Sequence, residues 1–165
     1  MTLTISGARN LRNPVLRLDA MAAPNAYELD DSVARVDMEV VWGYLSTEAY
    51  WSRWRTREIV EQQIKTAWRV IGVYEQSSGD MVGFARAVSD GCAMAYLADV
   101  FVLRSHRGQG LGFRLVRAMI DDGPGARFLW MLHTTDAHGL YAKFGFAPPQ
   151  HTRYLERRSQ LGRPG

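Results

Sequence analysis

The sequence predicts an α/β fold built around one mixed sheet. Apolar stretches of strand length alternate along the chain with segments whose apolar residues recur at helical spacing. A glycine-rich turn at 108–112 separates an apolar run at 98–103 from an amphipathic segment, giving the order strand, turn, helix. The 165 residues are enough for one domain with a hydrophobic core, and 47% hydrophobic with 22% charged residues is ordinary for a globular protein.

The individual elements follow from capping residues, turn sequences and periodicity. Residues 1–24 contain Gly7, Pro14 and Pro24 with weak periodicity, so we expect an irregular N-terminal extension and a single folded domain at 25–165. Asp37 and Thr56 each precede an apolar stripe at helical spacing, which predicts two capped helices. In chain order the sequence predicts a strand at 27–36, helices at 38–45 and 57–68, strands at 70–75, 81–89 and 93–103, a helix at 111–121, a buried strand at 128–133, a helix at 137–144 and an edge strand at 152–157.

Composition excludes several classes of protein. Cys92 is the one cysteine, so no internal disulfide or cysteine metal cluster is expected, and no two ligands stand at a recognisable metal spacing. No apolar run approaches the roughly 18 residues that cross a bilayer, and the N-terminus lacks a continuous apolar export segment, which predicts a cytoplasmic protein. The formal charge of +3 comes mainly from scattered arginines rather than from one basic helix, which fits an anionic cofactor better than nucleic acid.

The glycine-rich turn predicts a site for a phosphate or pyrophosphate. The first turn of a helix has N–H groups without intrahelical acceptors, and the helix dipole adds about half a positive charge there. Glycines let the backbone approach an anion closely and adopt positive φ without strain. The spacing G-x-G-x-G differs from the dinucleotide pattern G-x-G-x-x-G, and no Gly-Lys-Ser/Thr follows as in a P-loop.

Two blocks of residues resemble one family. Arg107, Gly110 and Gly112 form an Arg-x-x-Gly-x-Gly pattern similar to the acyl-CoA pyrophosphate loop of the GNAT N-acetyltransferase superfamily. About thirty residues later, the segment from Leu140 to Phe146 resembles that family's Leu-Tyr-x-x-x-Gly-Phe block. The resemblance covers roughly residues 27–158. It implies the GNAT fold, with a mixed central sheet of about six to seven strands splayed between its two central parallel strands and about four helices. The splayed strands would be 93–103 and 128–133, with acetyl-CoA in the opening as co-substrate.

The resemblance also implies how acetyl-CoA is held. The pyrophosphate would meet the loop amides and the pantetheine arm would pair with a strand edge as an added strand does. Arg107 would pair with a phosphate or lie at the rim of the loop, and Thr134 replaces an asparagine that the family often carries seven residues before its tyrosine. His138 faces either the cofactor or solvent. The implied backbone contacts are Gly108, Gln109, Gly110, Leu111 and Gly112 for the pyrophosphate, and Val100, Phe101 and Val102 for the pantetheine.

Acetyl transfer from a thioester to an amine needs a group that takes a proton and a group that gives one. Tyr141 is the expected acid, because its phenol can donate a proton to the departing sulfur. The alternative role of Tyr141 is to pack the short helix against the sheet. Asp99 lies in an apolar strand, where burial is expected to raise its pKa and suit it to be the base. Asp99 would otherwise form a structural pair with an arginine such as Arg86. His133 is the second candidate base, with a structural hydrogen bond as its alternative.

The acceptor site is expected near an aromatic segment. Tyr50, Trp51 and Trp54 would line a pocket for an amine or fill the core, and Arg86 is a further candidate for acceptor contact. Arg55, in the same segment, would hold an acceptor carboxylate or belong to a solvated face. The sequence thus predicts acetyl transfer to a primary amine of a small molecule, with no nucleic-acid or membrane partner and a homodimer left open. The alternatives are a protein lysine or N-terminal acetyltransferase and a non-catalytic acyl-CoA-binding regulator.

Overall fold

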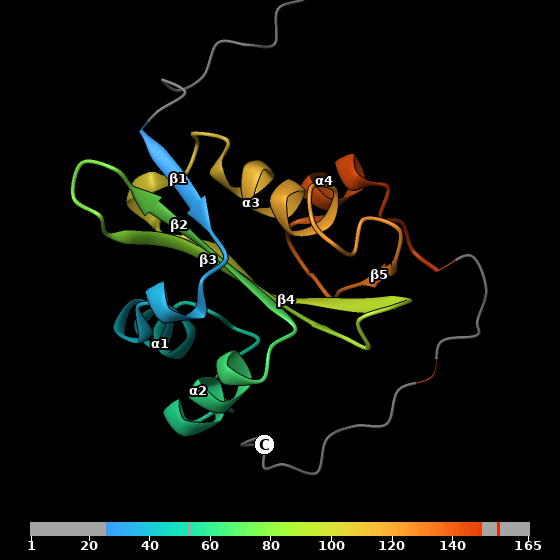
Figure 1. Cartoon of the computed structure of the whole chain (residues 1–165), viewed down its shortest axis with the longest axis horizontal. Helices are drawn as coiled ribbons and strands as arrows, with labels where there is room; N and C mark the ends of the chain where they lie inside the picture. Colours follow the sequence, from blue (N-terminus) through green and yellow to red (C-terminus); the bar gives the residue numbers. More distant parts are fainter. Residues whose placement is uncertain (1–25, 53, 150–154, 156–165) are drawn as a thin grey trace, which may run out of the picture.

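The computed structural model of this chain describes residues 26–52, 54–149 and 155. A five-stranded sheet runs through the middle of the molecule, with α1 and α2 on one face and α3 and α4 on the other (Figure 1). The strands are β1 (Tyr27–Asp30), β2 (Arg69–Glu75), β3 (Met81–Ser89), β4 (Met94–Val102) and β5 (Leu129–Met131). The helices are α1 (Met38–Thr47), α2 (Arg57–Lys65), α3 (Leu111–Ile120) and α4 (His138–Tyr141).

The sheet opens between β4 and β5. Strands β1 to β4 pair in sequence order and antiparallel, whereas β5 is parallel to β4. The parallel pairing joins only Met94–Tyr96 to Leu129–Met131. In the described part of the chain, the edge of β4 beyond Tyr96 therefore has no strand beside it on the β5 side, as expected for a sheet that splays between two parallel strands.

A β-bulge interrupts β4 at Asp99. Phe84 pairs with Phe101 and Arg86 with Ala98, so Asp99 and Val100 together lie opposite the single residue between Phe84 and Arg86. Asp99 has a φ of 52°, in the left-handed region that residues other than glycine rarely adopt. A bulge re-aims side chains and changes the strand's direction. Here it places the Asp99 carboxylate beside residues from the α1–α2 loop.

Side-chain caps start the two helices on one face of the sheet, as predicted. The Asp37 carboxylate accepts from the amides of Glu39 and Val40 at the start of α1, and the Thr56 hydroxyl accepts from Ile59 at the start of α2. Each cap satisfies N–H groups that a helix leaves without an intrahelical acceptor. The buried faces of these helices then pack on the sheet, using Val41 and Leu45 from α1 and Val60 and Ile64 from α2.

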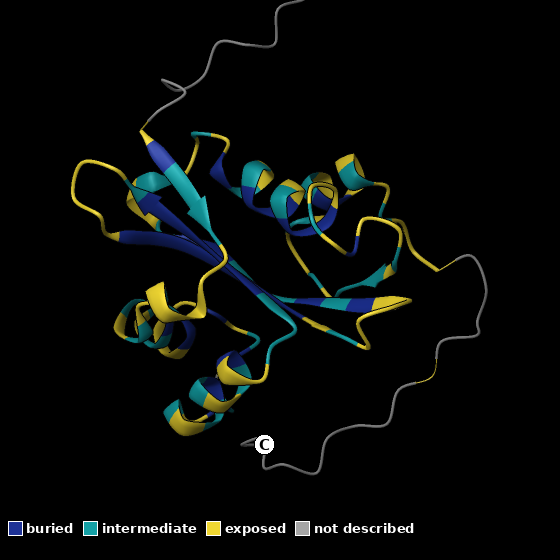
Figure 2. Ribbon diagram, in the orientation of Figure 1, coloured by how far each residue is buried: buried dark blue, intermediate teal, exposed yellow. Residues whose placement is uncertain are grey.

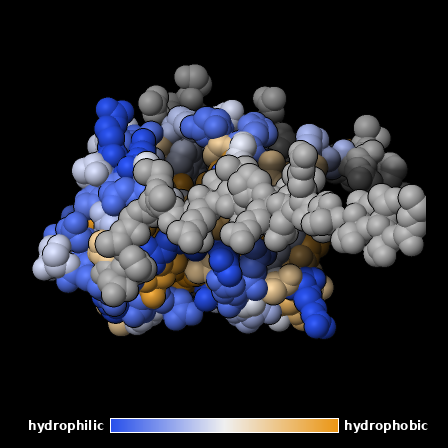
Figure 3. All heavy atoms as spheres, turned by 90° about the horizontal axis from the view of Figure 1, so that it is seen from above, coloured by the Kyte–Doolittle hydropathy of each residue, from blue (hydrophilic) through white to orange (hydrophobic). Residues whose placement is uncertain are grey.

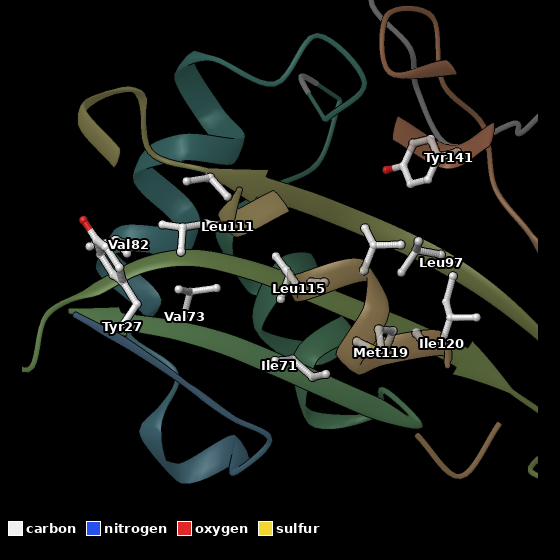
Figure 4. Close-up of a cluster of buried hydrophobic side chains, with 14 residues drawn as sticks. Tyr27, Ile71, Val73, Val82, Leu97, Leu111, Leu115, Met119, Ile120 and Tyr141 are labelled. Carbon is white, nitrogen blue, oxygen red and sulfur yellow. The ribbon is translucent and has the colours of Figure 1, made fainter. Parts of the chain in front are cut away.

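Two hydrophobic clusters, one on each face of the sheet, form the core. Dark blue buried positions concentrate on the strands and on the sheet-facing sides of the helices in Figure 2. Figure 4 shows the cluster under α3, where Leu111, Leu115 and Ile120 lie against strand residues such as Ile71 and Leu97. The coloured residues on the face drawn in Figure 3 are largely hydrophilic, with a few hydrophobic patches between them. Among the described helices, none is long and apolar enough to cross a membrane.

Several predicted elements are shorter than expected. The strand predicted at 27–36 ends at Asp30, because the Asp30 carboxylate accepts from the Ser32 amide at 2.7 Å and from Arg35, which closes a turn into a 3-10 helix. The predicted buried strand at 128–133 is wrong in length and burial: β5 has three residues, and Leu129 is 64% exposed. β5 is exposed because it is the last strand of the described sheet and pairs with only three residues of β4.

The predicted number of strands is not confirmed. The described residues form five strands and four α-helices in a mixed sheet, where six to seven strands were expected. The predicted strand at 152–157 lies outside the described residues apart from Leu155, and the predicted extension at 1–24 lies wholly outside them. The order of strands and helices, and the parallel pairing of β4 with β5, are those that the resemblance implies.

Candidate functional site

A cavity of about 770 Å³ lies where the sheet opens. One wall comes from the aromatic loop between α1 and α2, the floor from β3 and β4, and the other wall from residues between β5 and α4 together with Tyr141. A volume of this size suits a small ligand. The lining residues are Tyr50, Trp51, Trp54, Arg55, Gln63, Arg86, Tyr96, Leu97, Ala98, Asp99, Val100, His133, Thr134, Asp136, Ala137 and Tyr141.

The glycine loop has the backbone geometry that its sequence predicts. Gly108 and Gly110 have φ of 78° and 74°, and Gly110 caps α3 in the left-handed conformation. Because glycine has no side-chain acceptor, the amides of the first turn of α3 receive no cap from it. A Cβ built on Gly108 or Gly110 meets no heavy atom within 4 Å, so the surface above both residues is open.

Arg107 holds this loop in place. Its Nε donates to the carbonyl of Val102 at 2.8 Å, and its Nη2 donates to the Tyr44 hydroxyl at 3.2 Å. The same Nη2 lies 3.7 Å from a carboxylate oxygen of Glu48. The guanidinium therefore ties the loop to the end of β4 and to α1. The predicted pairing of Arg107 with a phosphate stays a prediction.

The expected pantetheine edge is on the same strand. Val100–Val102 belong to the part of β4 that extends past its pairing with β5, and Val100 lines the cavity. An extended molecule could pair with this edge as an added strand. The glycine loop lies beyond Val102 on the same chain segment, so the open edge of β4 leads from the cavity toward the loop.

Asp99 is the centre of a buried ion-pair cluster. Arg55 donates to both carboxylate oxygens, at 2.7 and 2.9 Å, and Arg86 Nε donates at 2.5 Å. The indole of Trp51 adds a fourth donor at 3.2 Å. Burial alone raises the pKa of a carboxyl, but hydrogen bonds and charge from the two arginines outweigh it, and the pKa of Asp99 is lowered.

The expected rise in the pKa of Asp99 is therefore wrong, because an apolar strand does not reveal which cations fold against it. The alternative, a pair with Arg86, is confirmed. A carboxylate held by two guanidinium groups is a weak proton acceptor, so this geometry disfavours Asp99 as the base. Arg55 is also not part of a solvated face, since its side chain is 4% exposed.

Tyr141 faces the cavity from the opposite wall. It is the buried residue of α4, and in Figure 4 its hydroxyl points away from that helix. Burial, followed by the nearby acidic groups of Asp136, Tyr50 and Tyr96, raises the pKa of Tyr141 to about 12. The phenol therefore stays protonated throughout the neutral range and is able to donate a hydrogen bond.

His133, Thr134 and His138 lie along the segment after β5. The Nδ1 of His133 is 3.0 Å from the Tyr96 hydroxyl, and His133 lines the cavity. The Thr134 hydroxyl accepts from the amide of Ala137, the residue before α4, at 3.1 Å. His138 is exposed and lies outside the cavity lining. Cofactor contacts from Thr134 and His138 stay predictions.

The aromatic loop forms a wall of the cavity and reaches across to the other side. Tyr50, Trp51 and Trp54 all line it, and the Tyr50 and Trp51 rings meet edge to face with centroids 4.9 Å apart. The Tyr50 hydroxyl accepts from the amide and hydroxyl of Thr135, at 3.1 and 2.5 Å. This contact connects the α1–α2 loop to the segment between β5 and α4.

Gln63 and Tyr96 line the cavity although the sequence did not assign them to the site, and Arg55 had a site role only as one of two alternatives. Arg55, Gln63 and Tyr96 face the cavity, and the Arg55 Nη1 donates to the Gln63 side chain at 2.8 Å. Tyr96 stands three residues before Asp99, so strict alternation would place the two on opposite faces of β4, and the bulge at Asp99 lets both line the cavity. Gln63 gave no local signal and Arg55 only an ambiguous one, because the inward direction of both depends on how the α1–α2 loop and α2 fold over β4.

Comparison with known proteins adds to this geometry. A profile described as "Acetyltransferase (GNAT) family" matches residues 39–146, which contain both the glycine loop and the Tyr141 block. A protein of Gibberella zeae described as a putative acetyltransferase is 28% identical over 130 residues, covering 73% of each chain.

Solved structures of acetyltransferases are also similar to this chain. A Xanthomonas campestris protein described as a putative acetyltransferase of the GNAT family is 33% identical, with a TM-score of 0.74 over 81% of this chain and 92% of that one. Glucosamine-6-phosphate N-acetyltransferase of Arabidopsis thaliana, 15% identical, shows the same fold with a TM-score of 0.55 over 79% of this chain and 99% of that one. This chain therefore belongs to the GNAT family of acetyltransferases and is an acyltransferase.

Proposed function

We propose that this chain transfers the acetyl group of acetyl-CoA to a primary amine of a small molecule, which attacks the thioester directly. The observation that carries the proposal is the open edge of β4. It starts in the cavity that Tyr141 faces and continues toward a helix N-terminus built from glycines of positive φ. Acyl donor and acceptor can therefore approach the same strand from its two ends.

The residues present fit acetyl-CoA. The amides at 108–112 would hold the pyrophosphate, since Gly108 and Gly110 leave open space above the backbone and the N-terminus of α3 carries partial positive charge. The backbone of Val100–Val102 would pair with the pantetheine arm. Bound there, acetyl-CoA supplies an activated acyl group, and the protein supplies position and proton transfer.

Tyr141 takes the role of the acid in this proposal. A phenol with a pKa near 12 keeps its proton at neutral pH and can donate to a sulfur as negative charge develops there. The ring is held in the wall of the cavity by its burial, and its edge meets Phe146 with centroids 5.8 Å apart. Packing and proton donation are thus compatible roles for one side chain.

His133 replaces Asp99 as the assigned base. The imidazole lines the cavity, and an imidazole nitrogen that carries no proton can accept one from an amine. An alkylamine of pKa about 10.4 requires about 1.4 kcal/mol for each pH unit below that value to lose its proton. His133 would take this proton directly or through a water molecule.

The proposal is tested with acetyl-CoA and a panel of amines. Acetyl-CoA should raise the melting temperature, because a ligand that binds only the folded state stabilises it. Release of CoA should then depend on the added amine, and mass spectrometry should find the acetylated amine. A protein that saturating acetyl-CoA does not stabilise would contradict the proposal.

The same measurements distinguish this function from the two alternatives, a protein acetyltransferase and a non-catalytic acyl-CoA-binding regulator. The hydrogen bonds between Tyr50 and Thr135 connect the two walls of the cavity, which favours a small acceptor over a protein chain. Labelled acetyl-CoA added to cell lysate distinguishes the two, since protein acceptors appear as labelled bands and small acceptors do not. Tight acetyl-CoA binding with no CoA release for any amine would instead indicate a regulator.

A further inference from the structure

Arg86 carries donors that the fold does not use. It lies on β3 with its side chain 9% exposed, and it lines the cavity floor. The Nε of Arg86 donates a hydrogen bond to the Asp99 carboxylate at 2.5 Å. Within the described part of the chain, Nη1 and Nη2 have no acceptor, yet no fully buried side-chain nitrogen or oxygen there lacks a partner. The two Nη groups must therefore be accessible from the cavity.

In Arg55, by contrast, all three guanidinium nitrogens donate hydrogen bonds within the protein. Its Nε donates to Ser52, its Nη1 to Gln63 and Asp99, and its Nη2 to Asp99. The two-pronged pair between Arg55 and Asp99 already balances one positive charge with one negative charge. Arg86 therefore adds a positive charge in excess of the carboxylates on the cavity floor.

An excess buried charge is costly unless an ion of opposite sign joins it. Beyond Arg55, Arg86 and Asp99, the acidic or basic lining residue among those described is Asp136, which is exposed on the opposite wall with Tyr141. The cavity is thus positive at its floor and negative across from it. A ligand with separate acidic and amino groups would match this arrangement of charge.

We propose that the acceptor is a small amine that carries a carboxylate, and that Arg86 binds this carboxylate through its free Nη donors. The inference rests on the proposed function and specifies its substrate class. A planar guanidinium binds a planar carboxylate through two parallel hydrogen bonds. With the carboxylate on Arg86, the amino group lies toward the wall that holds Asp136 and Tyr141. Trp51 and Trp54 contact the body of the acceptor.

The test compares acids with their amides. L-phenylalanine, L-tryptophan, L-leucine and glycine are each assayed against the corresponding amide by CoA release. We expect kcat/KM to favour the acid by about tenfold or more in the pairs that react, the usual scale for a charge-assisted hydrogen bond. Amides that react as well as their acids in every pair would overturn the inference. A phosphonate analogue preferred tenfold over its carboxylate would overturn the choice of carboxylate.

The Arg86→Gln variant assigns the effect to this residue. Asp99 keeps Arg55 and Trp51 as partners in this variant, and the melting temperature verifies folding. In Arg86→Gln, KM for the acids should rise about tenfold, while kcat for the acids and the kinetic constants of the amides stay within about threefold of the parent protein. In Arg86→Lys, KM for the acids should lie between the values of the parent protein and of Arg86→Gln. Arg57→Gln removes an arginine paired with Glu39 and Glu61 outside the cavity and is the matched control. An unchanged acid-to-amide ratio in Arg86→Gln would also overturn the inference.

A binding measurement separates this inference from the proposed function. 3-Phenylpropionate carries the carboxylate without an amine, so it binds without reacting. Calorimetry should detect it in the parent protein and show at least tenfold weaker binding in Arg86→Gln. That result supports the carboxylate site even if no amine is acetylated. If no amine is acetylated and the parent protein does not bind 3-phenylpropionate, both ideas fail.

Discussion

The glycine loop and the Asp99 cluster both belong to the β4 region, but they are built from different parts of the chain. The loop presents backbone amides above glycines of positive φ, with open space where side chains would be. The cluster consists of side chains from the α1–α2 loop, β3 and β4 that meet in the buried floor of the cavity. A local backbone conformation can hold an anion by itself, whereas the cluster depends on the whole fold.

This difference predicts that a change in the cluster affects stability first. Asp99→Asn removes the charge between Arg55 and Arg86 while nearly preserving shape. Because it leaves two buried guanidinium groups with no carboxylate between them, we expect unfolding to become easier by about 3–5 kcal/mol. Chemical denaturation at pH 7 measures this loss. A variant of parental stability with a changed acidic limb in its pH–rate profile would restore Asp99 as a candidate base.

The pH dependence of stability gives an independent check of the same cluster. The pKa of Asp99 in the folded protein is lowered below the value of about 3.9 in an unfolded chain. Its ionised form therefore contributes stability above pH 4, and this contribution is lost as the pH falls through the folded pKa. Asp99→Asn should show a smaller loss of stability than the parent protein between pH 6 and 3. Parallel curves for the two proteins would contradict the assignment.

Across the cavity, Tyr141 provides the largest expected effect on chemistry. Tyr141→Phe removes only the hydroxyl, so folding and acetyl-CoA affinity should persist while kcat falls by about 10². With a pKa near 12, the phenol should cause no descending limb in the pH–rate profile between pH 8 and 10. Steady-state kinetics over that range test both statements. A kcat within threefold of the parent would leave Tyr141 a packing residue.

Gly110 tests the backbone-built site. Gly110→Asp places a side chain at φ 74° and adds a negative charge where the pyrophosphate is expected, so acetyl-CoA affinity should fall at least about tenfold. Gly79→Asp is the matched control, since Gly79 has φ 78° and open space in the turn between β2 and β3. Calorimetric titration compares the variants. Equal losses of affinity in both would attribute the effect to backbone strain rather than to phosphate binding.

The same contrast explains what the sequence could predict. The glycine loop was predictable because glycine spacing after a strand directly restricts the backbone, and the caps at Asp37 and Thr56 act within a few residues. The partners of Asp99 were only partly predictable. Arg86 pairs with it across adjacent strands, but Arg55 reaches it over 44 positions through a loop without periodicity. The bulge that aims Asp99 has no glycine or proline to mark it.

The burial of β5 could not be predicted from its local sequence either. Its apolar sequence predicts a buried strand, yet burial depends on neighbours that are far away in sequence. Among the described residues, Met94–Tyr96 are the ones that pair with β5, so its side chains remain partly exposed. The open edge of β4 follows from this short pairing. A local pattern can indicate a strand, but it cannot indicate where two strands separate.

The smallest expected effect concerns Tyr50, which joins the two walls of the cavity. Tyr50→Phe removes the acceptor of two hydrogen bonds from Thr135 on an exposed part of the protein. We expect a loss of stability of about 1 kcal/mol or less and a KM for the acceptor raised a few-fold at unchanged kcat, because the contact positions one wall of the cavity against the other. Tyr50 lines the same cavity as Tyr141, so this variant also tests whether the Tyr50 hydroxyl donates the proton instead. Parallel kinetics of Tyr50→Phe and Tyr141→Phe decide between them: a hundredfold fall in kcat in the Tyr50 variant alone would transfer the acid role from the α4 wall to the aromatic loop.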